Sequence, residues 1–140
     1  MKKLLHILFL SAGIMASAQK KNIQPSQLPA PALDFLEKYS QGSALHHSYK
    51  FTDDDHTRFK VVMADDTEFE FSEQGDWTEV DGKNHAVASG FLPKNIIDYL
   101  KKNYPGKRLL KAEKDSKKIE IKLIDGSEVE FDLNGNPIKK

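Results

Sequence analysis

The chain has 140 residues, no cysteine, and 21 basic against 21 acidic residues. The missing cysteine excludes disulfide bonds, thiol catalysis and cysteine-ligated metals, and the balanced charge lacks the basic excess that is typical of a nucleic-acid-binding protein. We therefore expect a globular protein that is stabilised by packing and has no nucleic-acid partner.

Residues 1–18 have the pattern of a secretory signal peptide. Two lysines precede an apolar run over residues 4–16, and Ala16, Ser17 and Ala18 form a small-residue cleavage site. The apolar run is shorter than the roughly 20 residues that a transmembrane helix needs, and no cysteine follows it to carry a lipid anchor. We expect cleavage after Ala18, which gives a periplasmic or secreted protein without a membrane anchor.

Residues 19–27 are predicted to form a flexible N-terminal segment, and the first structural unit is predicted over 28–82. This unit is predicted to open with a helix, because Pro29 suits a first helical position, where its missing N–H needs no partner. The hydrophobic period then changes from 3.6 to 2 residues, which predicts strands. Outer strands are predicted over 45–51 and 76–81. The inward-facing side chains of the central strands are Phe59, Val61, Met63, Phe69 and Phe71.

The second unit, predicted over 92–139, repeats the first. The letters DDTEFEFSEQG at 65–75 return as DGSEVEFDLNG at 125–135, which places a hairpin at the same point of both units. A helix is again expected from a proline, Pro93, in its first turn.

Turn-forming pairs join the strands of this second unit. Asp125-Gly126 and Asn134-Gly135 are typical of type I′ hairpin turns, which need a positive φ at both central residues. Outer strands are expected over 107–113 and 136–139. The first unit carries a short insertion near residues 52–57, which we expect at a loop tip because insertions collect there.

Each unit thus consists of a helix and four strands. Half of the chain would bury only a marginal core alone, so we expect the two units to share one sheet. The predicted fold is α+β: two tandem helix-plus-four-strand units form a single domain over 28–139. That domain is a two-layer α/β sandwich with an antiparallel sheet of about eight strands, both helices on one face and the other face open to solvent.

The stretches LPKNIIDYLKKNYPG and IEIKLIDGSEVEFDLNGNPI in the second unit resemble the PepSY-like family of small secreted bacterial proteins, also described as β-lactamase-inhibitor-like. The shared marks are Leu92-Pro93, Tyr104-Pro105-Gly106, Asp125-Gly126 with Glu128, and Asn134-Gly135. The first unit departs from the family pattern at Asp66, where the family has glycine. The resemblance implies tandem α-plus-β units and an extracytoplasmic binding or inhibitory role, and it brings no catalytic residue.

The open face of the predicted sheet is the leading candidate for a partner-binding surface. The strand period points these charged side chains outward: Lys60, Glu68, Glu70, Glu120, Lys122, Glu128 and Glu130. Trp77 and Phe91 fit the core pattern less well and are candidate aromatic anchors. The alternative is that Trp77 covers a sheet edge and Phe91 packs on the start of the second helix.

No serine or histidine lies in an activating sequence context, which argues against an enzyme. We therefore expect a non-enzymatic module without a cofactor that binds an unidentified protein or peptide, with inhibition of that partner as one form of the role.

The alternative function is the binding of a small ligand or a divalent metal. Asp53, Asp55 and His56 lie together in the sequence, and carboxylates beside an imidazole can ligate a cation; a solvated loop tip is the competing interpretation. His46 and His47 are adjacent in a predicted strand, so they should point to opposite faces, and at most one of them can join His56.

Overall fold

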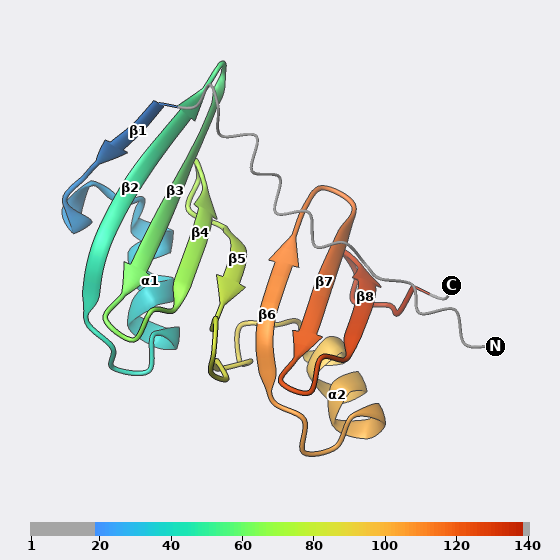
Figure 1. Cartoon of the computed structure of the whole chain (residues 1–140). Helices are drawn as coiled ribbons and strands as arrows, with labels where there is room; N and C mark the ends of the chain where they lie inside the picture. Colours follow the sequence, from blue (N-terminus) through green and yellow to red (C-terminus); the bar gives the residue numbers. More distant parts are fainter. Residues whose placement is uncertain (1–18, 139–140) are drawn as a thin grey trace.

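The computed structural model describes residues 19–138. They form two layers, an antiparallel sheet and two helices that lie behind it in Figure 1. The strands are β1 (Gln19–Asn22), β2 (Leu45–Asp53), β3 (His56–Met63), β4 (Glu68–Ser72), β5 (Trp77–Asp81), β6 (Leu109–Lys114), β7 (Lys118–Leu123) and β8 (Glu128–Asp132). The helices are α1 (Ala30–Tyr39) and α2 (Lys94–Asn103), with a 3-10 turn at Pro25–Gln27.

The predicted fold class is confirmed. The sheet has eight strands in the order β1 to β8, so every strand pairs with its neighbours in the chain. Helix α1 precedes β2 to β5, and α2 precedes β6 to β8. The predicted signal peptide lies outside the described residues.

The number of strands agrees with the prediction, but one edge strand differs. The sheet contains β1 at its N-terminal edge in place of the strand predicted over 136–139 at its C-terminal edge. Residues 19–27, predicted to be flexible, contain β1, in which Lys20 pairs with Phe51 of β2. The insertion at the β2–β3 hairpin lengthens β2 to nine residues, whereas β6 has six, and β1 pairs along this lengthened strand.

The strand predicted over 136–139 is reduced to an isolated bridge between Phe131 and Pro137. Pro137 has no N–H to donate to a strand ladder. Ile138 N donates one hydrogen bond to Glu130 O at 2.9 Å. The last two residues of the chain lie outside the described part, so the finding concerns residues 136–138.

The hairpin turns differ from the predicted type I′. In the four equivalent turns only one residue has a positive φ; these residues are Asp66, Gly75, Gly126 and Gly135. Each turn is a three-residue loop that ends in this left-handed residue, a common alternative to the two-residue turn. Aspartate side chains stabilise three of these loops: Asp65 Oδ1 accepts from Thr67 N and Asp125 Oδ1 from Ser127 N, both at 3.0 Å, and Asp132 Oδ1 accepts from Asn134 N and Asn136 N, both at 2.9 Å. Such a bond is typical of aspartate in turns.

A single hydrophobic core lies between the sheet and the helices. Strand side chains alternate between the two faces, and those on the helix face come from both units. The most buried large side chains are Val61, Phe69, Phe71, Val80, Ile96, Ile119, Ile121, Leu123 and Phe131. The two units therefore fold as parts of one layer pair.

Two turns pack closely against the helix starts. A Cβ at Gly75, in the β4–β5 turn, would lie 2.9 Å from Pro29 Cβ at the start of α1. In the second unit Gly135 lies against Asn95, whose Nδ2 donates to Asn134 O at 2.6 Å. Each unit thus positions its helix through the turn that follows its central hairpin.

This close approach predicts that Gly75→Ala costs more stability than Gly126→Ala. Both glycines have a φ near +90°, at +91° and +90°, but nothing lies within 4 Å of a Cβ added at Gly126. We expect Gly126→Ala to cost about 1–2 kcal/mol from the left-handed backbone alone. Gly75→Ala should cost at least about 1 kcal/mol more because it crowds α1. Urea unfolding of both variants measures the difference, and equal losses would contradict the packing account.

Candidate functional site

The helix-free face of the sheet carries an unbroken row of glutamates. Directly opposed residues share a face, and neighbouring strands lie about 4.8 Å apart. The pairing register places these five side chains opposite one another, from β4 to β8: Glu70, Glu79, Glu113, Glu120 and Glu130. We call this set the glutamate row. Lys60 of β3 continues it on one side, opposite Glu70.

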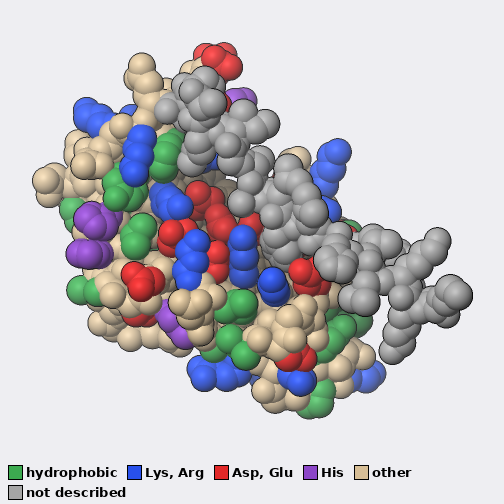
Figure 2. Space-filling model, in the orientation of Figure 1, with side chains coloured by type: hydrophobic (Ala, Val, Ile, Leu, Met, Phe, Trp, Pro, Cys, Tyr) green, Lys and Arg blue, Asp and Glu red, His purple; other side chains and the backbone are tan. Residues whose placement is uncertain are grey.

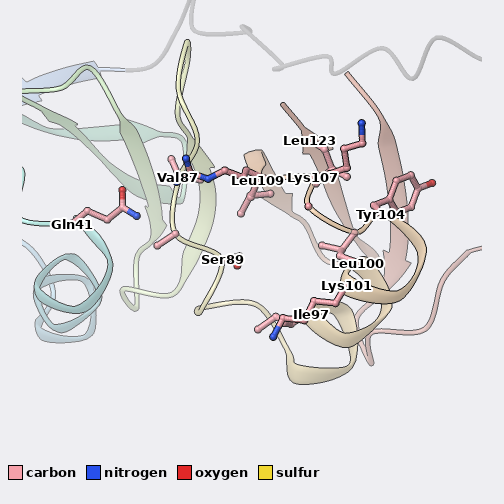
Figure 3. Close-up of a pocket in the computed structure, with 13 residues that line it drawn as sticks. Gln41, Val87, Ser89, Ile97, Leu100, Lys101, Tyr104, Lys107, Leu109 and Leu123 are labelled. Atoms are coloured by element: carbon pink, nitrogen blue, oxygen red, sulfur yellow. The ribbon is translucent and has the colours of Figure 1, made fainter. Parts of the chain in front are cut away.

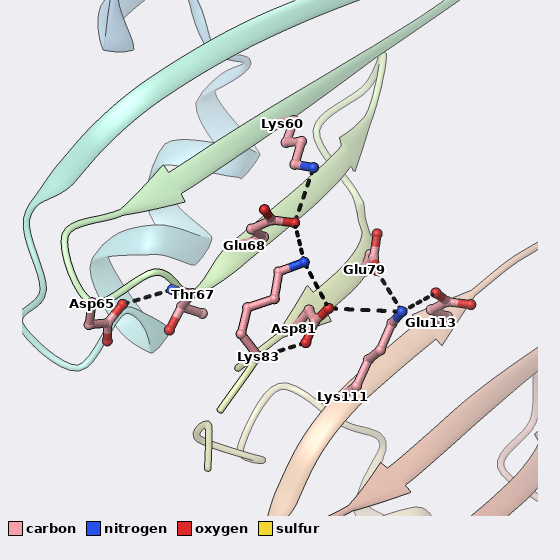
Figure 4. A network of polar contacts seen from close by, with 9 residues as sticks. All are labelled: Lys60, Asp65, Thr67, Glu68, Glu79, Asp81, Lys83, Lys111 and Glu113. Atoms are coloured by element: carbon pink, nitrogen blue, oxygen red, sulfur yellow. Dashed lines mark hydrogen bonds and ion pairs between the residues drawn. The ribbon is translucent and has the colours of Figure 1, made fainter. Parts of the chain in front are cut away.

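Lysines pair with the row and with Glu68, which lies beside it on the same face. Lys118 Nζ lies 2.8 Å from Glu120 and 3.3 Å from Glu130. Lys60 Nζ lies 3.0 Å from Glu68, which also accepts Lys83 at 3.0 Å (Figure 4). The face is therefore a band of alternating charges in which carboxylates outnumber the ammonium groups beside them.

Lys111 joins the two halves of the sheet at the centre of this band. Strands β5 and β6 pair through only three residue pairs. Lys111 Nζ lies 3.1 Å from Glu79 and 2.9 Å from Glu113, with Asp81 at 3.9 Å (Figure 4). Its side chain is only 14% exposed. Burial alone would lower the pKa of Lys111, but the bonds to Glu113 and Glu79 outweigh burial and raise it, so the ammonium stays charged.

Glu70 and Glu79 form a hydrogen-bonded carboxyl pair in the row. Burial and the neighbouring Glu79 together raise the pKa of Glu70 to about 8. Burial would also raise the pKa of Glu79, but the hydrogen bond from Glu70 and the charge of Lys111 outweigh it and lower that pKa. At neutral pH Glu70 is thus mostly protonated and donates to ionised Glu79.

An aromatic strip lies beside the row on the same face. His47, Tyr49 and Phe51 alternate along β2, and Tyr49 is directly opposite Lys60. Ring centroids are 5.9 Å apart for His47 and Tyr49 and 6.4 Å apart for Tyr49 and Phe51. Cations cover the strip: Lys20 Nζ lies 4.0 Å from the Tyr49 ring, and Arg58 lies 5.1 Å from the Phe51 ring. Figure 2 shows this face, with the charged side chains gathered over the middle strands.

Comparison with known proteins places the chain in a family. A family model described as "Putative beta-lactamase-inhibitor-like, PepSY-like" matches residues 57–139. The chain belongs to this family. The comparison with curated proteins returned no match.

Three solved structures are similar to this PepSY-like protein over most of both chains. One from Bacteroides thetaiotaomicron, described as a "putative calcium-regulated periplasmic protein", is 32% identical, covers 86% of this chain and 94% of its own, and has a TM-score of 0.80. A "putative periplasmic protein" of the DUF2874 family from Bacteroides vulgatus is 33% identical, with 86% and 95% covered and a TM-score of 0.81. Another from B. vulgatus, of unknown function, is 32% identical, with 87% and 97% covered and a TM-score of 0.77.

All three of these similar structures are described as periplasmic proteins. The description of the family names an inhibitor-like protein and no enzyme activity. Within residues 19–138 of the PepSY-like protein, no helix is long and apolar enough to span a bilayer.

Most of the predicted surface residues lie on the open face. The register places there Lys60, Glu68, Glu70, Glu120, Lys122, Glu128 and Glu130. The aromatic strip was not predicted from the sequence. The sequence pattern that could have predicted the strip is the alternation of His47, Tyr49 and Phe51, in a strand that pairs with the one containing Lys60.

Trp77 and Phe91 lie on the helix side instead, so the idea that Trp77 anchors a partner on the open face is wrong. Their ring centroids are 5.0 Å apart, and Phe91 also contacts Phe35 and Tyr39 of α1. A bulge after Glu70 shifts the register, so Trp77 is opposite the buried Phe71. Phe91 therefore packs on the first helix.

The acidic hairpin tip, which includes His56, does not meet His46 and His47. Asp53 is directly opposite His56, with Asp55 in the turn between them. His47 is opposite Val62, six residues from Asp53 or roughly 20 Å along the strand. A bulge between Leu45 and His47 brings the rings of His46 and His47 to 4.3 Å, so the prediction that they point to opposite faces is wrong. Within residues 19–138 no group of three or more acidic or histidine side chains is arranged to hold a metal ion.

Proposed function

We propose that this PepSY-like protein is a periplasmic, non-enzymatic binding module that presents its open sheet face to a protein partner with a basic surface. The glutamate row carries this proposal. Like charges directly opposite one another destabilise a sheet, yet the register aligns five carboxyl groups on five successive strands, and of these Glu70 is held mostly neutral by its raised pKa. A local arrangement that costs stability is typical of a functional site. Basic side chains of a partner would neutralise the row.

The aromatic strip gives the same surface an apolar anchor. Tyrosine and arginine are enriched in protein interfaces, and Tyr49 and Arg58 lie side by side with Phe51 at one end of the charged band. Because Tyr49 is opposite Lys60, the strip and the row form one continuous surface. The charges would set orientation and association rate, and the rings would supply the buried contact.

Comparative capture from a periplasmic extract tests this function. The bait is the chain from residue 19 onward, used as wild type, as Glu113→Gln/Glu120→Gln in the row, and as Lys102→Glu on the exposed side of α2. We expect a protein that the wild type and Lys102→Glu retain and that the row variant loses. Added salt should elute it, because salt screens the attraction between the charged face and a basic partner. If all three baits retain the same proteins, the open face is not the binding surface. If the captured protein is an enzyme, its activity with and without the module tests inhibition.

The proposed periplasmic location of the protein can be tested separately from its binding function. A periplasmic protein whose signal peptide is removed after Ala18 begins at Gln19. N-terminal sequencing of the protein from fractionated cells should return Gln19-Lys20, and an intact N-terminus in the cytoplasmic fraction would contradict both the cleavage and the location.

Calcium binding is a second candidate, favoured because the similar protein from B. thetaiotaomicron is described as calcium-regulated. In this chain the acidic tip of the β2–β3 hairpin, Asp53 to His56, is the place to test. Calorimetric titration with calcium and with zinc should give heat, and a bound ion should raise the melting temperature. Asp53→Asn/Asp55→Asn should abolish both effects. The absence of heat with wild type would remove this candidate.

A further inference from the structure

A groove lies between α2 and the segment that connects the two units, on the side of the sheet away from the glutamate row. Helix α1 covers the first unit and α2 the second, and the connecting residues 82–93 cross the join between them. Beside this connection lies an open groove of about 320 Å³ (Figure 3). Gln41, the connecting residues 87–89, and α2 with the loop that follows it line its sides. Junctions between structural units are common places for ligand sites.

The floor of the groove is apolar and firmly held. It consists of core side chains that are at most 8% exposed: Val87, Leu100, Leu109 and Leu123. The connection that forms one wall is tied to the sheet, since Val87 N donates to Leu109 O at 2.9 Å and Gly82 N donates to Leu110 O at 2.8 Å. Because backbone bonds fix the wall and the core fixes the floor, the hollow is preformed.

The rim of the groove is basic. Lys101 on α2 and Lys107 and Arg108 in the following loop line it, and no acidic side chain does. Lys107 pairs with Asp125 at 3.0 Å. Lys101 and Arg108 are exposed and form no ion pair with a described residue. An apolar floor with cations among the lining residues matches a ligand that has a hydrocarbon body and an anionic end.

We propose that this groove binds a small amphipathic carboxylate of the medium-chain fatty acid class. The alkyl chain would cover the floor, and the carboxylate would meet Lys101 and Arg108, whose charged N–H groups are strong carboxylate partners. The volume is at the small end of the usual range for ligand pockets, about 300–1,000 Å³, so it suits one alkyl chain rather than a two-chain lipid. This site is separate from the proposed protein-binding face, and its failure would leave that function standing.

Decanoate is the probe for this site, titrated into the chain from residue 19 onward and followed by calorimetry and amide NMR. We expect one saturable site with shifts at Ala88, Ser89 and Ile97. Lys101→Glu and Arg108→Glu should each weaken binding about fivefold or more, as expected for loss of a charge pair. Lys102→Glu makes the same charge change on the next residue, which does not line the groove, and should leave binding almost unchanged.

Two further measurements make the test decisive. Decyltrimethylammonium has the same chain with a cationic end and should not bind. Ser89→Trp adds bulk to the groove wall at a half-exposed position without changing any charge, so it should abolish decanoate binding while thermal melting confirms the fold. The proposal is overturned if decanoate shows no saturable binding, if the cationic probe binds equally, or if Lys102→Glu weakens binding as much as Lys101→Glu.

Discussion

Replacing Lys111 with methionine should lower the free energy of unfolding by about 3–5 kcal/mol, the range for removing one partner of a buried ion pair. The methionine keeps the length of the side chain but leaves Glu79 and Glu113 without the ammonium that lies about 3 Å from both. With Asp81, three mostly buried carboxylates would then face one another at the narrow junction of β5 and β6. The substitution should therefore weaken the pairing of β5 with β6, which joins the two halves of the sheet.

Urea unfolding at pH 7 measures this loss, with Lys107→Met as the matched control. The ion pair of Lys107 with Asp125 is 46% and 33% exposed, and such surface pairs contribute about 0–1 kcal/mol. At pH 5 the deficit of Lys111→Met should shrink, because a proton on one of the orphaned carboxylates relieves the repulsion. Similar losses in the two variants would mean that Lys111 is only a surface charge.

The wild-type protein should lose stability as the pH rises from about 5 to 8, and Glu70→Gln should remove most of that dependence. The pKa of Glu70 is raised from its ordinary value of 4.5 to about 8, so between these values the folded state holds a proton that the unfolded state releases. The stabilisation is complete below the unfolded pKa and is lost as the pH approaches 8. The slope is at most about 1.4 kcal/mol per pH unit for one proton. The lowered pKa of Glu79 acts below pH 4.5, outside this window. The raised pKa values of Glu113 and His85 add a smaller dependence of the same sign, which Glu70→Gln should leave in place.

The measurement is the unfolding free energy of both proteins at pH 5, 6, 7 and 8. Glutamine imitates the protonated carboxyl, because its amide can donate to Glu79 at every pH. Glu128→Gln, on the same face in the second unit, is the control and should keep the wild-type slope. Equal slopes for wild type and Glu70→Gln would show that the two carboxyls do not share a proton.

The hydrophobic periodicity of the sequence was sufficient to predict the two layers of the fold, the sheet and the helices. Phe59, Val61, Phe69 and Phe71 alternate with charged residues, so the inward and outward sides of the central strands follow from the sequence. Strand β1 could not be predicted in this way, because Gln-Lys-Lys-Asn has no apolar alternation. Those residues form a strand only because a lengthened β2 offers an edge to pair with, which is a tertiary effect.

The site was harder to predict than the fold because it depends on register. Bulges after Glu70 and between Leu45 and His47 change which side chains share a face, and nothing in the local pattern marks them. The glutamate row also needs the pairing of β5 with β6, which joins residues about 30 positions apart through Glu79 and Glu113. Single outward glutamates were visible in the sequence, but their alignment across both units was not.

The strictly sequential order of the strands has a kinetic consequence. Every strand pairs only with strands adjacent in the chain, so little loop-closure entropy must be lost before contacts form, and such local topologies fold quickly. For a chain that emerges from its N-terminus, β1 to β5 and α1 are complete before β6 appears, so half of the sheet can form early. The contacts of Lys111 across β5 and β6 can form only after β6 appears, so the junction between the halves of the sheet closes after the first half is complete.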